Sequence, residues 1–214
     1  MSNIKLFYDV SSFYSGLAVI RICRKIRDKS FVNKFELKPF VLGGVFKSQG
    51  VQAPALVNPT KGKYMWRDVE RLAKELGYPH FANSAFPLNS VLAGRVIAYL
   101  NANEAKFKNS EPEIPIALRF SEKTFEAAYV QDVDVTNAEN LSKILKTILP
   151  DVDTDAIVKE ANTQKYKDIL KANTNEAIEL GIFGAPSFIC PDGELFWGND
   201  RLMSAYNWTK KAKL

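Results

Sequence analysis

The sequence is poor in the side chains that most often carry enzyme chemistry. Its 214 residues include two cysteines, Cys23 and Cys190, and one histidine, His80. No Cys-x-x-Cys pair occurs, which excludes the usual dithiol redox motif. We expect both cysteines to be buried, reduced thiols and His80 to lie in a surface loop. One histidine without a second ligand near either cysteine gives no metal site, and no Gly-x-Ser-x-Gly motif accompanies it, so we expect neither a metal nor a serine triad.

Long apolar runs, nucleotide-binding glycine motifs and one-sided charge are also missing. No stretch reaches eighteen consecutive apolar residues, so we expect no membrane span. The glycines match neither a dinucleotide fingerprint nor a Walker loop. Lys and Arg number 29 against 24 Asp and Glu, and the net charge of +5 is spread in mixed patterns, so we expect no nucleic-acid partner. A first strand that starts by residue 4 leaves no room for a leader peptide, and we expect none.

The sequence does have a strong strand-to-helix signal at its start. Residues 4–10 form a short apolar, aromatic-rich run that predicts a buried strand. Ser12 follows as a helix N-cap, and residues 16–25 have helical spacing. Residues 33–42 alternate with period two and predict a second strand, so the two strands should pair in parallel around the helix. A side chain at position 12 would stand at the positive end of the helix dipole, where an anion is stabilised.

The rest of the chain predicts a helical block followed by a hairpin. Residues 43–62 are rich in glycine and proline and predict a loop with at most a short helical turn. Helices are then predicted at 64–76, 89–101, 116–129, 138–148, 154–161 and 163–180, strands at 184–190 and 195–198, and a last helix over 201–210. This order predicts an α/β, thioredoxin-like fold (β-α-β, then β-β-α) interrupted by a large all-helical insertion. We divide it into 1–60 and 181–214 as the two halves of the thioredoxin-like domain and 61–180 as the inserted helical domain.

Four separated stretches carry a resemblance to a known family: residues 7–15, 61–68, 181–186 and 197–201. They are similar to the kappa-class glutathione transferases and the related 2-hydroxychromene-2-carboxylate isomerases. Both groups resemble, more distantly, the bacterial periplasmic disulfide oxidoreductases, in which Cys-x-x-Cys opens the first helix. In this sequence Ser12-Phe13-Tyr14-Ser15 stands in that place. The resemblance implies glutathione as co-substrate.

The serine at position 12 determines the chemistry that we expect. A serine cannot form a mixed disulfide, but its hydroxyl can donate a hydrogen bond to a bound thiolate. Such a charge-assisted bond contributes roughly 1.5–3 kcal/mol, which corresponds to about one to two pKa units. The helix dipole adds roughly 0.3–1 kcal/mol in the same direction. Together they would ionise much of a thiol whose ordinary pKa is about 8.5, without a histidine. The alternative is that Ser12 is only an N-cap.

The resemblance also implies the rest of a glutathione site. Pro186 would be a cis-proline that turns the backbone N–H and C=O of Ala185 toward the cysteinyl part of glutathione. Asn199 and Asp200 would hold the γ-glutamyl end, with Asp200 pairing with its ammonium group. The alternative is that these two residues only cap the last helix.

Two residues of the second matching stretch complete the implied site. Lys61 matches a position near the glycine carboxylate of glutathione, and Asp68 matches a position linked to glutathione binding. A solvated loop lysine is the alternative for Lys61, and we expect Tyr64 in the core. The chain departs from the family at Phe13, where a proline is frequent, and near Gly50, where relatives carry an asparagine.

The leading hypothesis is a glutathione transferase that conjugates the thiolate to small hydrophobic electrophiles and also reduces peroxides. The first alternative is a glutathione-dependent 2-hydroxychromene-2-carboxylate isomerase, which would differ in the pocket around Phe13, Phe46 and Trp66. The second is a non-catalytic binding protein on the same fold. The resemblance implies a homodimer. The terminal Ala212-Lys213-Leu214 is a close variant of the peroxisomal Ser-Lys-Leu signal, so we expect a peroxisomal location, and otherwise a cytoplasmic or mitochondrial one.

Overall fold

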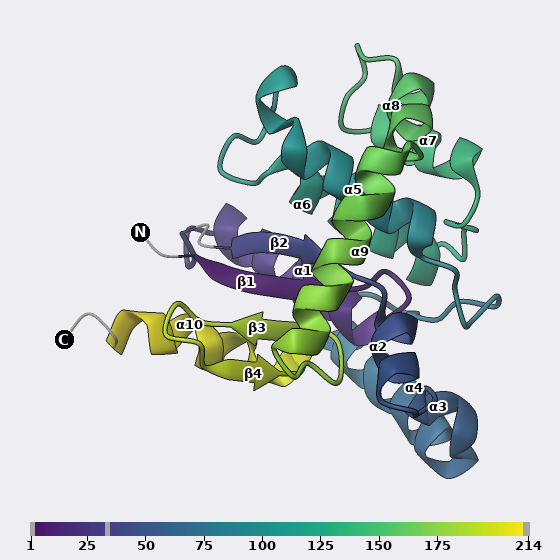
Figure 1. Cartoon of the computed structure of the whole chain (residues 1–214), viewed down its shortest axis with the longest axis vertical. Coiled ribbons are helices and arrows are strands. Elements are labelled where there is room, and N and C mark those ends of the chain that lie inside the picture. Colours follow the sequence, from purple (N-terminus) through teal and green to yellow (C-terminus); the bar gives the residue numbers. More distant parts are fainter. Residues whose placement is uncertain (1–2, 33–34, 212–214) are drawn as a thin grey trace.

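The computed structural model describes residues 3–32 and 35–211 and contains a small mixed sheet surrounded by helices (Figure 1). In chain order the elements are β1 Ile4–Tyr8, α1 Phe13–Arg27, β2 Phe35–Pro39, α2 Leu42–Ser48, α3 Pro54–Val57, α4 Pro59–Glu75, α5 Val91–Ala102, α6 Ile116–Tyr129, α7 Ala138–Lys146, α8 Thr154–Ala161, α9 Gln164–Glu179, β3 Ser187–Ile189, β4 Leu195–Trp197 and α10 Leu202–Lys211, with 3₁₀ turns η1 Glu104–Lys106 and η2 Asn199–Arg201. This is the predicted α/β, thioredoxin-like order.

The sheet has the strand order β2-β1-β3-β4. As predicted, β1 and β2 pair in parallel, with Leu6 opposite Leu37, because α1 provides the crossover. Strand β3 runs antiparallel to β1, with Leu6 opposite Phe188, and β4 completes a hairpin with β3. The carboxyl end of β1 therefore lies beside the start of β3. This places the segments around Ser12 and Pro186 next to each other.

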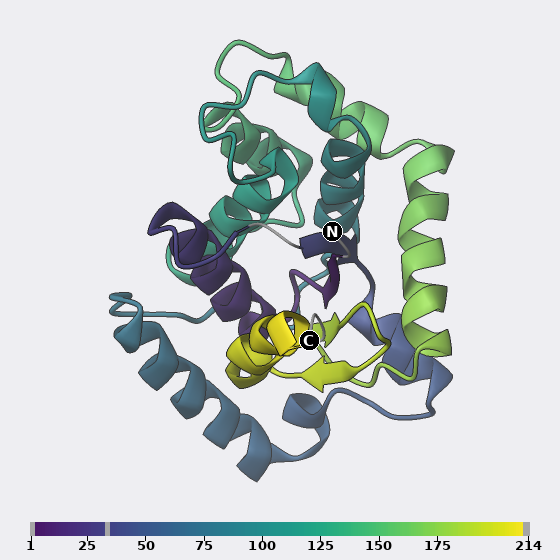
Figure 2. The ribbon, with the colours of Figure 1, turned by 90° about the vertical axis from the view of Figure 1, so that its left-hand side faces the viewer.

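The two faces of β1 bury different cores because side chains alternate along a strand. Ile4, Leu6 and Tyr8 face the large core that includes α1, α5 and α6. Phe7 faces the smaller core on the other side, where it packs with residues of α2 and α9 such as Val45 and Ala177. Figure 2 shows α1 and α9 on opposite sides of the strands. Both faces of the sheet are therefore covered by helices.

The prediction of a loop over residues 43–62 was wrong. This segment contains α2, α3 and the first turn of α4. Pro54 and Pro59 each open a helix, a position where a missing N–H costs nothing. Gly62 lets α3 and α4 approach closely, since a Cβ there would lie 2.5 Å from the Ala55 carbonyl oxygen. Glycine and proline serve here as helix starts and contact points rather than as breakers.

The division into 1–60, 61–180 and 181–214 stays a prediction. The boundary at residue 61 falls inside α4, which begins at Pro59. Helix α9, at the end of the proposed insertion, contacts both β2 and α2. No described helix is long and apolar enough to cross a membrane. Ala212, Lys213 and Leu214, on which the peroxisomal prediction rests, lie outside the described residues.

Candidate functional site

Ser12 caps α1 at the point where the chain leaves β1. Its backbone is extended (φ −99°, ψ 109°) and its Oγ accepts a hydrogen bond from the Ser15 N–H at 3.2 Å. The same hydroxyl donates to the Ala185 carbonyl oxygen at 2.9 Å. Only 8% of the residue is exposed. Ser12 is therefore a true N-cap, as the alternative interpretation requires. Its hydroxyl also bonds to Ala185, which lies just before β3, the strand that pairs with β1.

The peptide bond between Ala185 and Pro186 is cis, as the resemblance implied. The Pro186 carbonyl accepts from the Gly198 N–H at 2.9 Å, which ties this loop to the end of β4. The Ala185 carbonyl is occupied by Ser12, whereas the Ala185 N–H donates to no acceptor among the described residues. A ligand with a backbone-like C=O could accept from this N–H as an added strand would.

Asn199 and Asp200 lie at the start of the last helical segment, but in different environments. Asn199 is buried, and Arg21 of α1 donates to its side-chain Oδ1 at 3.1 Å and to its backbone carbonyl at 3.2 Å. The Asp200 side chain is 69% exposed and lies 3.5 Å from Arg201. Gly198 has φ +112°, and a Cβ there would meet Asp200 Oδ1 at 2.5 Å, so the turn needs glycine. The Asp200 carboxylate is exposed enough to accept a cationic ligand group beside Arg201, and Asn199 fixes the turn to α1.

Lys61 and Asp68 both lie on α4, which corrects the expectation of a loop at Lys61. Lys61 is exposed in the first turn of the helix, and its N–H donates to Asn58 Oδ1 at 2.9 Å. Asp68 is half-buried, accepts from Tyr14 Oη at 3.0 Å and pairs with Arg71 at 3.2 Å. Burial and the Asp68 carboxylate raise the pKa of Tyr14. Asp68 thus joins α4 to the start of α1.

Aromatic rings cover the outer side of the α1 start. The Phe13 and Trp66 ring centroids lie 4.7 Å apart, and Phe86 packs against both, at 5.8 and 5.0 Å. Phe86 precedes a second cis-proline, Pro87, and no sequence signal had placed it here. Phe46 lies on α2 and makes no ring contact with these three in the described part of the chain. Tyr64, expected in the core, is 60% exposed with the Arg71 guanidinium 5.6 Å from its ring centroid.

A buried carboxylate, Asp9, lies between the end of β1 and Ser12 in the chain. Its oxygens accept from the Ser11 N–H at 2.9 Å and from the Leu42 N–H at 2.7 Å. Burial raises the pKa of the Asp9 carboxyl, and hydrogen bonds from Ser90, Ser11 and Leu42 oppose the rise. Asp9 therefore joins the ends of β1 and β2 to the start of α2. The sequence indicated only a turn residue, because its burial depends on helices far along the chain.

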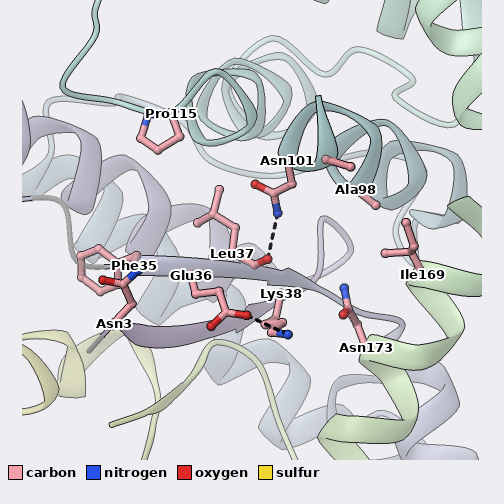
Figure 3. Close-up of a pocket in the computed structure, with 11 residues that line it drawn as sticks. Asn3, Phe35, Glu36, Leu37, Lys38, Ala98, Asn101, Pro115, Ile169 and Asn173 are labelled. Atoms are coloured by element: carbon pink, nitrogen blue, oxygen red, sulfur yellow. Dashed lines mark hydrogen bonds and ion pairs between the residues drawn. The ribbon is translucent and has the colours of Figure 1, made fainter. Parts of the chain in front are cut away.

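Two hollows in the described part of the chain lie away from Ser12. The larger, about 460 Å³, runs along the outer edge of β2 (Figure 3). There Asn101 of α5 donates to the Leu37 carbonyl and Asn173 of α9 to the Pro39 carbonyl, both at 2.9 Å. These amides satisfy carbonyls that an edge strand would otherwise present to another chain. The smaller hollow, about 240 Å³, lies between α5 and α9.

The remaining expectations concern cysteines, histidine and metals. Cys23 and Cys190 are free and buried, and His80 is exposed, as predicted. In residues 3–32 and 35–211 no three side chains of His, Cys, Asp or Glu gather in a way that could hold a metal ion. The expectation of a metal-free site stays a prediction.

Comparison with known proteins gives a consistent match over nearly the whole chain. The family model described as DSBA-like thioredoxin domain matches residues 3–205. Glutathione S-transferase kappa 1 of Rattus norvegicus is 28% identical over 203 residues, covering 93% of this chain and 87% of the relative. Glutathione S-transferase kappa 1 of Homo sapiens is 26% identical over 209 residues, covering 94% and 87%.

Solved structures agree with the fold. The 2-hydroxychromene-2-carboxylate isomerase structure has a TM-score of 0.79 and 21% identity, covering 98% of this chain and 95% of its own. The cytosolic disulfide reductase DsbM from Pseudomonas aeruginosa, solved with GSH, has a TM-score of 0.65 and 13% identity, covering 99% and 97%. With the family model spanning residues 3–205, the chain belongs to the family of the DSBA-like thioredoxin domain.

Proposed function

We propose that the chain is a glutathione transferase of the kappa type, in which Ser12 holds the sulfur of glutathione as a thiolate. The observation that carries this proposal is the position of the Ser12 hydroxyl, at the first turn of α1 and 2.9 Å from the carbonyl before cis-Pro186. A thiolate beside this hydroxyl would also lie at the positive end of a helix of 15 residues. Similarity to kappa transferases at 26–28% identity supports the proposal.

The single proton of the Ser12 hydroxyl must change partner when glutathione binds. It is now donated to the Ala185 carbonyl oxygen, while Ser12 Oγ itself accepts a hydrogen bond from the Ser15 N–H. A rotation about the Cα–Cβ bond would redirect the O–H to sulfur. The gain is the difference between a charged and a neutral acceptor, because charge-assisted bonds are about twice as strong as neutral ones. The Ala185 carbonyl would then accept from the glutathione backbone.

The other predicted residues would bind the two ends of glutathione. Asp200, with an exposed carboxylate, would pair with the γ-glutamyl ammonium group, and Asn199 would position it through its contacts with Arg21. Lys61, exposed at the start of α4, would pair with the glycine carboxylate. The oxygens of Asp68 are engaged with Tyr14 and Arg71, so we assign it the positioning of α4.

The second substrate would be a small hydrophobic electrophile. With a peroxide, the same thiolate would attack the peroxide oxygen, and a second glutathione would complete the reduction to alcohol and water by forming glutathione disulfide. An isomerase acting on 2-hydroxychromene-2-carboxylate would use the thiolate as a reversible nucleophile, so the site alone does not separate the two reactions. Conversion of a chromene carboxylate without conjugation of an electrophile would favour the isomerase. Lack of any glutathione binding at millimolar concentration would favour the non-catalytic alternative.

The direct activity test compares glutathione conjugation to 1-chloro-2,4-dinitrobenzene in wild type and Ser12→Ala. We expect kcat/KM to fall by about 10- to 100-fold, the equivalent of one charge-assisted hydrogen bond. Asn137→Ala is the matched control, because Asn137 caps α7 with the same kind of side-chain bond and lies outside the site. Equal activity of Ser12→Ala and wild type would refute the role of Ser12.

Two further proposals concern the assembled and targeted protein. We propose a homodimer. Four apolar side chains within residues 51–64 are exposed, and their exposure favours this proposal: Val51, Leu56, Val57 and Tyr64. We also propose that Ala212-Lys213-Leu214 directs the protein to peroxisomes. A fluorescent fusion that keeps this free carboxyl end should enter peroxisomes, and the same fusion without Leu214 should not; identical distributions would refute the signal.

A further inference from the structure

A hollow of about 240 Å³ between α5 and α9 collects positive charge. Arg95 of α5 and Lys167 and Lys171 of α9 line it, over an apolar floor that includes Val91 and Leu170. We call it the α5–α9 hollow. It begins at Val41 in the turn after β2 and includes none of the residues assigned above to glutathione.

The charges of this hollow have no counter-ion in the described part of the chain. Arg95 Nη1 donates to the neutral Asn162 Oδ1 at 2.6 Å, and its Nε is buried without a hydrogen-bond partner. Neither Lys167 nor Lys171 forms an ion pair with a described carboxylate. The nearest acid in sequence, Asp168, is exposed and accepts from Gln164 at 2.8 Å.

Such an arrangement costs stability unless an anion completes it. Lys167 and Lys171 stand four residues apart on one helix face, where like charges repel. Arg95 Nε is buried without an acceptor among the described residues, and a buried donor without a partner is destabilising. All three cations line the same hollow.

We propose that the α5–α9 hollow binds a phosphate-type oxyanion, either inorganic phosphate or the phosphate group of a small ester. A phosphate group carries a charge of about −1.5 to −2 at neutral pH and several acceptor oxygens, which suits one guanidinium and two ammonium groups better than a single carboxylate does. The volume leaves room for the oxyanion together with several waters, since one water occupies about 30 Å³.

The test is calorimetric titration of the full-length chain with inorganic phosphate at constant, low ionic strength. Wild type should show saturable one-site binding, and Arg95→Gln should weaken it at least about tenfold. Lys171→Gln should weaken it as well, and serves if Arg95→Gln does not fold. Lys165→Gln is the matched control. This substitution removes the same charge from α9, but Lys165 lies against the Tyr166 ring and is not among the residues that line the hollow.

Three results would overturn the proposal. One is the absence of saturable binding up to about 10 mM phosphate, the range of very weak sites. Another is an equal loss in Lys165→Gln and Lys171→Gln, which would indicate general surface charge. The last is loss of phosphate binding in Ser12→Ala, which would place the anion in the thiol site. Phenyl phosphate in place of inorganic phosphate then separates an ester site from a free-phosphate site.

Discussion

One hydroxyl at Ser12 serves both the fold and the proposed chemistry. Its oxygen caps α1 through the Ser15 N–H, and its proton reaches the carbonyl before cis-Pro186. A cysteine at this position could attack disulfides, whereas a serine cannot form a mixed disulfide but can donate a hydrogen bond to a thiolate. In the proposed mechanism the reactive sulfur comes from glutathione, and the protein would contribute by keeping that sulfur charged.

The native thiols should be inert, since burial raises the pKa of Cys23 and, with nearby Asp192 and Glu194, raises that of Cys190 to about 11. About one Cys190 in ten thousand would then be a thiolate at pH 7. We expect a disulfide reagent such as dithionitrobenzoate to label neither cysteine of the folded protein at pH 7, and labelling of Cys190 to accelerate as pH rises toward 11. Two equivalents should react in denaturant. Rapid labelling of the folded chain at pH 7 would contradict this.

The N-cap at Ser12 could be predicted from the local sequence, whereas the cis peptide bond at Pro186 was implied by the family resemblance. Ser12 as an N-cap and Pro186 as a cis-proline were confirmed. The sequence could not reveal which partners the carboxylates of Asp68 and Asp9 would have on other elements. Asp68 is engaged with Tyr14 and Arg71, and Asp9 is buried, because helices far along the chain close over them.

At the scale of elements, Arg27 holds α6 against α1. Its guanidinium bonds both oxygens of Glu122 at 2.7 and 2.6 Å, and the Glu122 side chain is only 3% exposed. Arg27→Gln would leave a buried carboxylate without its cation, so we expect a loss of about 2–4 kcal/mol, below the full buried-pair range because Arg27 is partly exposed. Urea unfolding measures it.

The matched control for this loss is Lys143→Gln. Lys143 pairs with Glu139 one turn away on α7, and both side chains are largely exposed. This pair should contribute no more than about 0.5 kcal/mol. Equal losses of unfolding free energy in Arg27→Gln and Lys143→Gln would show that the α1–α6 ion pair stabilises the fold no more than an exposed pair does.

The contact between Gly184 and Trp197 joins the cis-proline loop to β4. A Cβ at Gly184 would lie 2.2 Å from Trp197 Nε1, so Gly184→Ala must displace the indole. We expect a cost of about 1–3 kcal/mol, as for other overpacked sites. Thermal unfolding measures this cost, and tryptophan fluorescence reports the displacement.

Gly43→Ala is the control for this substitution. No atom lies within 4 Å of the Cβ position at Gly43, which is on helix α2, so the variant should gain about 0.5–1 kcal/mol. A Gly184→Ala protein as stable as Gly43→Ala would mean that the close approach is not required. Such contacts explain why residues 43–62 misled the sequence analysis: Gly62, like Gly184, is needed for space and not for a turn.

At the scale of the whole molecule, the order of strands and helices could be predicted from the sequence. Which helices pack around the candidate site could not. The order β-α-β, helices, then β-β-α follows from hydrophobic period and turn residues. The contact of α4 with α1 and of α9 with β2 depends on tertiary packing that overrides local pattern. These contacts decide which candidate residues meet.

The proposed homodimer is the prediction that belongs to this scale. We expect sedimentation equilibrium to give twice the mass of one chain at micromolar concentration. Leu56→Asp should weaken the association, because Leu56 is 51% exposed on α3 among other apolar side chains. Ile178→Asp, at an exposed site on α9, is the control. A stable monomer in wild type would remove this proposal.

The central claim is tested most directly by the pKa of bound glutathione, followed through the ultraviolet absorbance of its thiolate during a pH titration. Bound to wild type, the thiol should titrate about one to two units below its ordinary value near 8.5, so that roughly a quarter to three quarters of it is charged at pH 7. Bound to Ser12→Ala, it should titrate close to the ordinary value. The same pKa in both proteins would contradict stabilisation of the thiolate by the Ser12 hydroxyl.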